Sequence, residues 1–582
     1  MNPRALLDSV VTRMPVSERS RMNCRHGLLP KGQLIISAVL GVAFGVARSY
    51  LASSYLHIDL TLVGCSAIAF LFFALLFLLF NLIGNTSWEP HGRPLLWVLA
   101  DSASSNQMAV RVAVALLACW LPYLLLMYPG NLSNDTTGQL TMFYTLMGHG
   151  ERWITAQHPV FDTLVFGAVT YPFYAIGHFR IGVFICIVLQ ELLTAASFGI
   201  VFAWSRRRLG ISNGSLTILL GVLAFCPVVP LMVCSLSKDT FFSWVYMLWL
   251  VSFFDCIIVG EVDKCHFLAL AVFGILMVLT KKLGFYVALF SFSVLTVFSV
   301  FKKKNRKALA SFALVVVVGL TYGICLPLLN AVTNAKPAYK SDTLIVPIQQ
   351  LAMAYSRYPE DFSSEDLDVV STFVKTEVID SGKWVKTNTD SIKKYGDSSV
   401  AGGFTDSQIS SFMAVWARIG LMHPDSYVDG WLTLEAPLFS FGKVVPLFDS
   451  LWHTWARSSV IPDQYFEKSV PFAQFSAQIR DWYNWLGTVP GVDLLLTQTL
   501  YAVLIPAYFI VSVLRRDRSL FPAVIPVIVS FLGLMVSPMV QPHFETMRYL
   551  VPFVYSIPIL LCMAWAQKDA TRQNDLKADK RH

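Results

Sequence analysis

The sequence predicts an all-α polytopic membrane protein with about 12 to 13 transmembrane helices, a juxtamembrane or re-entrant element and an α-rich extracytoplasmic domain. Three observations predict this fold class. The 582 residues are 55% hydrophobic and only 14% charged, with a mean hydropathy of +0.57, whereas soluble domains carry about a quarter charged residues. The chain contains many apolar runs long enough to span a bilayer. Its basic residues concentrate in the short loops between those runs, so the net charge of +8 indicates membrane orientation and not nucleic-acid binding.

The apolar runs follow one another along most of the chain. They lie at about 33–52, 60–83, 108–129, 180–204, 211–234, 240–259, 265–280, 285–301, 309–328, 493–514, 520–540 and 549–566. A further run, about 160–177, is preceded by Pro159 and contains Pro172 and Gly177.

Basic clusters set the expected orientation. The polar, mostly basic N-terminal tail lacks the leading apolar core of a signal peptide, so we expect it to be cytoplasmic. Arg206–Arg208, Lys302–Lys304 and Arg515–Arg516 should also be cytoplasmic. All of them share one side only if the run at 160–177 does not cross. We therefore expect this run to lie along the interface or to re-enter, because protein can bury such broken backbone.

These considerations divide the chain into six regions. They are a cytoplasmic N-terminal tail (1–32), two extra transmembrane helices with a cytoplasmic loop (33–107), a transmembrane core (108–328) with a first outer loop at 130–157, an extracytoplasmic domain (329–492), C-terminal transmembrane helices (493–567) and a cytoplasmic tail (568–582). Residues 329–491 hold 13 Lys/Arg and 18 Asp/Glu, a balance of −5, which leaves +13 for the remainder.

The extracytoplasmic domain should be mainly helical. Residues 364–379 and 407–421 show helical apolar spacing, and the polar segment 383–404 is expected to form a surface loop. We find no internal repeat and no glycine-rich nucleotide-binding fingerprint, and the ten cysteines show no metal-ligand spacing.

Chemistry is expected where polar motifs interrupt the apolar pattern. Asn134 and Asp135 lie just beyond the third apolar run, and Gln157-His158-Pro159 opens the run at 160–177. A carboxylate at a membrane boundary is costly unless it serves a purpose. The first outer loop is therefore the best candidate for a functional site.

These motifs carry a resemblance. Residues 128–135 (Y-P-G-N-L-S-N-D) and 157–160 (Q-H-P-V) resemble the first outer loop of the GT-C superfamily of polytopic membrane glycosyltransferases, of the bacterial type. Residues 235–239 (S-L-S-K-D) are similar to a second acidic outer loop, 281–286 (K-K-L-G-F-Y) to a basic boundary motif, and 545–552 (E-T-M-R-Y-L-V-P) to an R-Y-x-x-P segment.

The resemblance covers roughly 105–330 and 493–567. The chain departs from the family in two ways: the spans at 33–52 and 60–83 precede the recognisable core, and the 329–492 domain lies inside the series of spans. We recognise no carbohydrate module in that domain.

The resemblance implies a polyprenyl-phosphate-linked sugar as donor and Asp135 as the catalytic base. A positioned base contributes ~10²–10⁴-fold in rate, and one carboxylate suits a single inverting displacement. The resemblance also implies substrate-binding roles for polar residues of the same motifs, namely His158, Lys238, Asp239, Lys281, Lys282, His543, Glu545 and Arg548. Asp239 could join Asp135 on a divalent cation, although hard metals usually take more oxygen ligands, so the cofactor stays open.

Simpler roles compete with each assignment. Asp135 could be the N-cap of a helix at 136–147. The basic residues could snorkel to lipid headgroups. Lys238 and Asp239 could form a plain ion pair, and His158 could merely begin a proline-led helix.

We therefore expect a glycosyltransferase that moves a sugar from a polyprenyl phosphate to an extracytoplasmic glycan, lipid or protein acceptor. It should be a multi-pass protein of the bacterial cytoplasmic (inner) membrane with its active site on the extracytoplasmic face. The alternative is a transporter or flippase of lipid-linked glycans, which should place ionisable residues near the bilayer midplane and show inverted repeats. A third possibility is a non-catalytic assembly partner in which Asp135 is dispensable.

Overall fold

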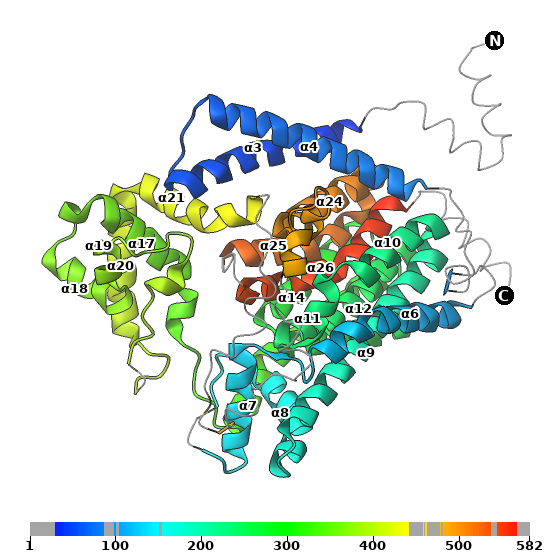
Figure 1. Ribbon diagram of the computed structural model, residues 1–582, viewed down its shortest axis with the longest axis horizontal. Coiled ribbons are helices and arrows are strands. Elements are labelled where there is room, and N and C mark those ends of the chain that lie inside the picture. The colour runs from blue at the N-terminus through cyan, green and yellow to red at the C-terminus, as the bar shows by residue number, and fades with distance from the viewer. Residues whose placement is uncertain are drawn as a thin grey trace.

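The computed structural model describes residues 29–86, 98–99, 104–150, 154–397, 399–440, 458, 460–461, 478, 481–536 and 544–566, except the side chains of Asn134 and of residues 544–547. Nearly all regular structure in this part of the chain is helical (Figure 1). Most of the predicted N-terminal tail and all of the predicted C-terminal tail lie outside it.

Among the described residues, nine helical segments are long and apolar enough to cross a membrane. They are α3 (Lys31–Ser53), α4 (Leu60–Gly84), α6 (Ser105–Leu126), α9 (Phe179–Leu209), α12 (Lys238–Val259), α14 (Lys282–Phe301), α15 with α16 (Asn305–Val332), the segment Arg518–Val536 that contains α25 (Phe521–Val536), and Arg548–Trp565 within α26 (Phe544–Trp565). Shorter apolar helices are α10 (Asn213–Phe225) and α13 (Lys264–Thr280). A helical multi-pass membrane protein is therefore the fold class, as the composition predicts.

Three predicted spans are not single α-helices. In the run at 309–328, a π-turn at Thr321–Cys325 joins α15 (Asn305–Leu320) to α16 (Leu326–Val332). The run at 211–234 divides into α10 and α11 (Val228–Val233) at Pro227, because proline lacks an N–H and cannot continue the helical hydrogen bonds. The run at 493–514 begins with a 3₁₀ turn at Asp493–Leu496 and a π-turn at Leu500–Leu504 before α24 (Ile505–Arg516). Apolar composition alone does not reveal these breaks.

The first two helices belong to the bundle. Gly41 and Gly45 of α3, in a G-x-x-x-G pattern, lie directly against Ser66 of α4, where a Cβ would clash, and small residues permit such close helix packing. Asn81 of α4 donates to Gln33 of α3 at 2.8 Å and accepts from Tyr508 of α24 at 2.8 Å. The pair is thus joined to the C-terminal helices by polar contacts.

The basic clusters gather at one end of the bundle. Arg208 Nε lies 2.6 Å from Asp255 at the C-terminal end of α12, and Lys307 Nζ donates to the Cys256 carbonyl at 2.9 Å. Arg516 donates to the Met563 carbonyl near the end of α26 at 2.8 Å. These cations sit against helix C-termini, where the helix dipole favours them. Asp255, a carboxylate inside the predicted span at 240–259, is part of this network.

Helix α8 (Val160–Ala175), the predicted broken element, does not reach that end. It packs beside the first half of α9, with Gly182 of α9 directly against Thr170 of α8. Figure 1 shows α7 (Asn134–Leu146) and α8 projecting together from the bundle. At 1.5 Å per residue, the 31 residues of α9 extend about 46 Å, so its basic end lies far from α8. The position of α8 relative to a bilayer stays a prediction.

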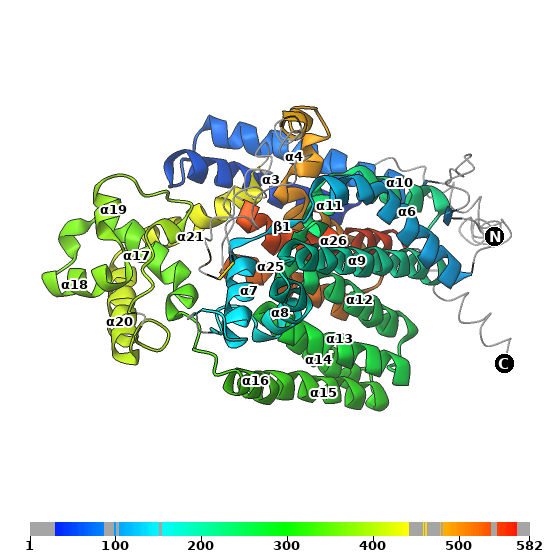
Figure 2. The ribbon, with the colours of Figure 1, turned by 60° about the horizontal axis from the view of Figure 1, so that its bottom comes forward.

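Residues 336–435, here named the insert domain, form a separate helical unit between α16 and α24 (Figures 1 and 2). Its helices are α17 (Ile345–Arg357), α18 (Ser364–Phe373), α19 (Thr376–Asp380), α20 (Asp406–Met422) and α21 (Pro424–Glu435). The helix predicted at 407–421 agrees with α20. The helix predicted at 364–379 is interrupted at Val374, where the chain turns to an extended conformation.

The predicted surface loop at 383–404 is only partly a loop on the surface. Ile392 and Phe404 are buried in a core shared with α17, α18 and α20, and Lys393 is 2% exposed. Phe404 stacks on Phe373 with 4.1 Å between ring centroids. The few apolar residues of this segment have no regular spacing, so periodicity could not reveal that they are buried.

The insert domain also contacts the α3–α4 connection. Tyr50 of α3 donates to Asp429 of α21 at 2.6 Å. Arg357 of α17 donates to the same carboxylate at 2.7 Å and to the Ser54 carbonyl at 3.0 Å. The domain therefore lies at the end of α3 that is remote from its N-terminus.

Candidate functional site

The site is built on two short strands that pair in parallel. β1 (Asn131–Leu132) pairs with β2 (Ser235–Leu236), with Asn131 opposite Ser235. Each strand leads directly into a helix, β1 into α7 and β2 into α12. Gly130 precedes β1 with φ +111°, a conformation that favours glycine, and a Cβ there would clash with Ile187.

The two strand–helix junctions share the sequence Leu-Ser-x-Asp-Thr, at 132–136 and 236–240. In both, the serine caps the helix: Ser133 Oγ accepts from the Thr136 N–H at 3.2 Å, and Ser237 Oγ accepts from the Thr240 N–H at 3.1 Å. The paired strands bring the two equivalent aspartates, Asp135 and Asp239, to adjacent helix N-termini.

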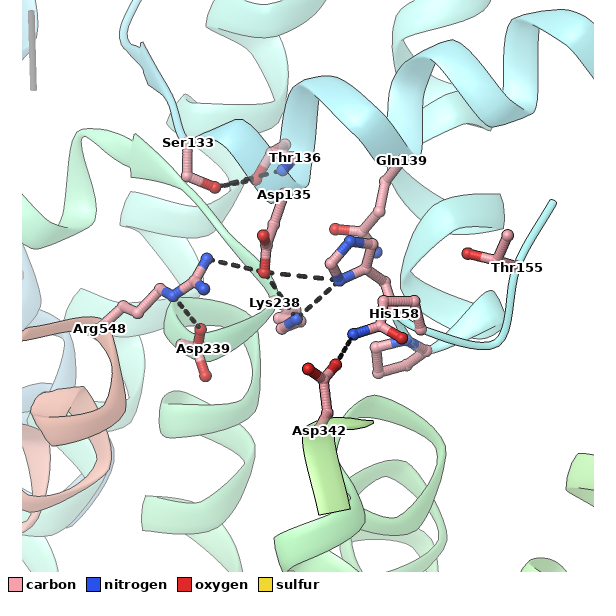
Figure 3. Close-up of polar contacts among 12 residues, drawn as sticks. Ser133, Asp135, Thr136, Gln139, Thr155, His158, Lys238, Asp239, Asp342 and Arg548 are labelled. Atoms are coloured by element: carbon pink, nitrogen blue, oxygen red, sulfur yellow. Dashed lines mark hydrogen bonds and ion pairs between the residues drawn. The ribbon is translucent and has the colours of Figure 1, made fainter. Parts of the chain in front are cut away.

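Asp135 faces three basic side chains (Figure 3). Its Oδ2 lies 2.8 Å from Arg548 Nη1, 2.9 Å from Lys238 Nζ and 3.4 Å from His158 Nδ1. Lys238 Nζ is also 3.0 Å from His158 Nδ1. Ser133 occupies the N-cap and α7 begins at Asn134, so Asp135 is not the N-cap of a helix at 136–147.

Asp239 forms the second half of the cluster. Its Oδ1 lies 2.5 Å from Lys281 Nζ, and its Oδ2 is 3.9 Å from Arg548 Nε. Lys281 Nζ also lies over the Tyr549 ring, 5.1 Å from its centroid. Arg548 therefore bridges the two carboxylates.

The cluster is positive and largely removed from solvent. Three strong cations (Lys238, Lys281 and Arg548) face two carboxylates, an excess of one positive charge. The Asp239 side chain is fully buried, that of Arg548 is 8% exposed and that of Asp135 is 20% exposed. A partly dry, cation-rich site at the start of two helices is suited to binding an anion.

The surroundings shift the pKa values of Asp135 and Lys281 from their usual values. Burial opposes ionisation of Asp135, but Lys238, Arg548 and His158 outweigh it and hold the pKa of this carboxyl well below its usual range. Burial lowers the pKa of Lys281, partly offset by Asp239. Asp135 is therefore a carboxylate at neutral pH.

Asp162 of α8 lies nearby in a contrasting environment. It is fully buried, and neither carboxyl oxygen has a hydrogen-bond partner among the described residues. Burial raises the pKa of Asp162 well above its usual value. Burial thus favours the neutral form of Asp162, and the sequence suggests no firm role for it.

A family model described as a family of unknown function (DUF6020) matches residues 144–578. The chain belongs to this family. The match includes His158, the α12 junction, Lys281 and Arg548, and it begins after Asp135. The searches found no curated protein and no solved structure that matches the chain.

In this DUF6020 chain, six of the predicted site residues converge. They are Asp135, His158, Lys238, Asp239, Lys281 and Arg548. Lys282, by contrast, is exposed at the start of α14, and within the described structure no ion pair joins it to the cluster. His543 lies outside the described residues, as does the side chain of Glu545.

The two carboxylates of the DUF6020 chain do not form a shared divalent-cation site. Each lies against cationic side chains that a metal ion would have to displace. In the described ranges, no group of three or more His, Cys, Asp or Glu residues could hold a metal.

Proposed function

We propose that this DUF6020 protein is a GT-C-type membrane glycosyltransferase of the bacterial cytoplasmic membrane. It transfers a sugar from a polyprenyl-phosphate donor to a glycan, lipid or protein acceptor on the extracytoplasmic face. The observation that carries the proposal is the buried, cation-rich cluster around the carboxylate of Asp135. The resemblance of its motifs to that superfamily supports it.

The proposed reaction is a single displacement at the anomeric carbon of the sugar. The acceptor hydroxyl oxygen forms a bond to that carbon as the bond from the carbon to the phosphate oxygen breaks. The polyprenyl phosphate leaves with the bonding electron pair, and Asp135 takes the acceptor proton. Arg548, Lys238 and Lys281 stabilise the charge that develops on the leaving phosphate.

Ion pairing makes Asp135 a weak base in the structure as it stands. Lys238 and Arg548 both lie within 2.9 Å of its Oδ2, and cations at this range disfavour protonation. A donor phosphate would compete for the same two cations. It would thereby weaken the extent to which they lower the pKa of the Asp135 carboxyl. Donor binding would therefore increase the basicity of Asp135 when a proton has to be accepted.

The main alternative, a transporter or flippase of lipid-linked glycans, would use the same cations to hold a lipid phosphate. The cluster lies at helix ends, where α7 and α12 begin, whereas alternating access usually places the substrate site near mid-span. This location favours transfer chemistry over transport.

The proposed function is tested by incubating the purified protein with radiolabelled polyprenyl-phosphate sugars and a membrane extract as acceptor source. We expect release of polyprenyl phosphate and label in an extracytoplasmic acceptor with at least one donor. A protein that moves labelled lipid across a liposome membrane without cleaving it would contradict the proposal and support transport.

Alkaline pH should weaken binding of the donor, because Lys281 loses its charge. Because burial lowers the pKa of Lys281, it should lose its charge at a lower pH than an ordinary lysine, whose pKa is about 10.4. We expect KM for the donor to rise towards high pH. In Lys281→Arg this rise should move to higher pH, because arginine stays protonated.

The matched control for this pH profile is Lys282→Ala, since Lys282 is the exposed neighbour of Lys281. Its profile should follow the parent protein. A Lys281→Arg profile that coincides with the parent would show that Lys281 does not hold the donor phosphate.

A further inference from the structure

The insert domain is joined to the loop that carries His158. Residues 154–156 and Lys336 pair through backbone hydrogen bonds: the Lys336 N–H donates to the Ile154 carbonyl, and the Ala156 N–H donates to the Lys336 carbonyl, both at 2.8 Å. Beneath them, Met142, Ile154 and Val160 form a small buried cluster. The loop is therefore paired with Lys336, the first residue of the insert domain.

Gln157 also contacts the insert domain, through both the oxygen and the nitrogen of its side-chain amide. Its Oε1 accepts from the Tyr339 N–H at 2.9 Å, and its Nε2 donates to Asp342 Oδ2. The side chain of the residue next to His158 is thus held at two points, both on the insert domain.

Asp342 is itself held from inside the insert domain. Lys393 Nζ lies 2.6 Å from Asp342 Oδ1 and 2.7 Å from Asp390 Oδ1. Lys393 is 2% exposed, and an ion pair in such surroundings is geometrically restrictive. The two oxygens of Asp342 therefore serve different partners, one in the domain and one in the site loop.

His158 follows Gln157 and points into the cluster. Its Nδ1 is 3.0 Å from Lys238 Nζ and 3.4 Å from Asp135 Oδ2. A continuous series of contacts thus runs from Lys393 through Asp342 and Gln157 to the residue beside the proposed base.

We propose that Asp342 is a positioning residue for the site: it fixes Gln157, and through it His158, so that the insert domain controls the geometry around Asp135. This inference rests on the proposed function for its effect on catalysis. The contacts that carry it are independent of that function.

The kinetic test is an exchange of the two interacting groups. In Asp342→Asn the ion pair with Lys393 is lost, and in Gln157→Glu two carboxylates face each other. The double variant Gln157→Glu/Asp342→Asn restores an amide opposite a carboxylate with the roles reversed, while Lys393 keeps Asp390. We expect each single variant to lower kcat about 10- to 100-fold, as loss of orientation does, with little change in the donor KM.

The double variant should recover most of that loss. Asp406→Asn is the control, because its partner Lys340 forms an exposed pair in the same domain that does not reach Gln157. A double variant no better than the worse single variant, or an Asp406→Asn variant with the same defect, would overturn the proposal.

A second measurement does not need transfer activity. Thr155→Cys, placed in the paired segment, is labelled in intact cells with a membrane-impermeant maleimide, and the peptide is quantified by mass spectrometry. Labelling should be faster when Asp342→Ala releases the loop, and unchanged with Asp406→Asn, because local opening exposes such sites.

The two measurements separate the two proposals. Faster labelling without turnover of any donor would uphold the coupling and count against the glycosyltransferase function. Equal labelling with and without Asp342→Ala would overturn the coupling even if transfer is observed.

Discussion

Asp135→Asn should lower the rate of sugar transfer by a factor on the order of 10²–10⁴, the usual contribution of a positioned general base. The substitution preserves size and removes the charge that accepts the proton. It also removes the carboxylate that competes with the donor phosphate for Arg548 and Lys238, which lie 2.8 and 2.9 Å away. Donor affinity should therefore be unchanged or higher, while kcat falls.

The measurement pairs initial transfer rates with equilibrium binding of radiolabelled donor to the same preparation. Asp406→Asn serves as the matched control, because it removes an exposed carboxylate whose partner is Lys340 and not a residue of the cluster. Full transfer activity in Asp135→Asn would remove this residue as the base. Weaker donor binding would mean that Asp135 holds the substrate and does not compete with it.

Arg548→Met should have the largest effect on stability. Arg548 bridges Asp135 and Asp239, and Asp239 is fully buried. In Arg548→Met, Asp135 keeps Lys238 and Asp239 keeps Lys281, but both carboxylates lose a shared buried partner, and breaking a buried ion pair costs about 3–5 kcal/mol. Adding Asp135→Asn to Arg548→Met should deepen the loss, because Lys238 then also loses its carboxylate partner.

Thermal unfolding in detergent would measure this loss, with Arg418→Met as the control. Arg418 pairs with Asp366 in the insert domain. The Arg418 side chain is 46% exposed although Asp366 is largely buried, so this half-exposed pair should contribute less than the buried network. Equal destabilisation by the two substitutions would contradict the view that the cluster is a dry ion network.

The same network should make stability depend on pH in acid. The pKa of Asp135 is lower in the folded protein than its ordinary value of about 3.9. Its ion pairs therefore contribute fully above that ordinary value, and their contribution is lost as the pH falls through the lowered folded pKa.

Much of the fold follows from local sequence. Hydropathy identifies the helices of spanning length, and the basic clusters predict that Arg206–Arg208 and Arg515–Arg516 share one end of the bundle, where the structure brings them. Hydropathy does not reveal the break at Pro227, because it does not register the missing N–H of proline. It does not reveal the buried residues of 383–404 either, because their burial depends on what surrounds the segment.

The candidate site follows from sequence only in part. The resemblance selects six residues that converge, but it treats Lys281 and Lys282 alike. The structure separates them: Lys281 precedes α14 with extended backbone and points at Asp239, whereas Lys282 begins the helix and is exposed. The shared Leu-Ser-x-Asp-Thr segments were visible in the sequence as a signal, and the pairing of their strands explains why the two aspartates lie in one cluster.

The sequence by itself determined a helical multi-pass membrane protein, the ends of its helices at which polar chemistry gathers, and the residue types available there. Only the tertiary structure decided that Asp135 meets Arg548, 413 positions away (548 − 135), and that Asp342 holds the loop of His158. The physical reason is that hydropathy and helix periodicity act over neighbouring residues. An ion pair forms wherever packing places two charges within a few ångströms, whatever their separation along the chain.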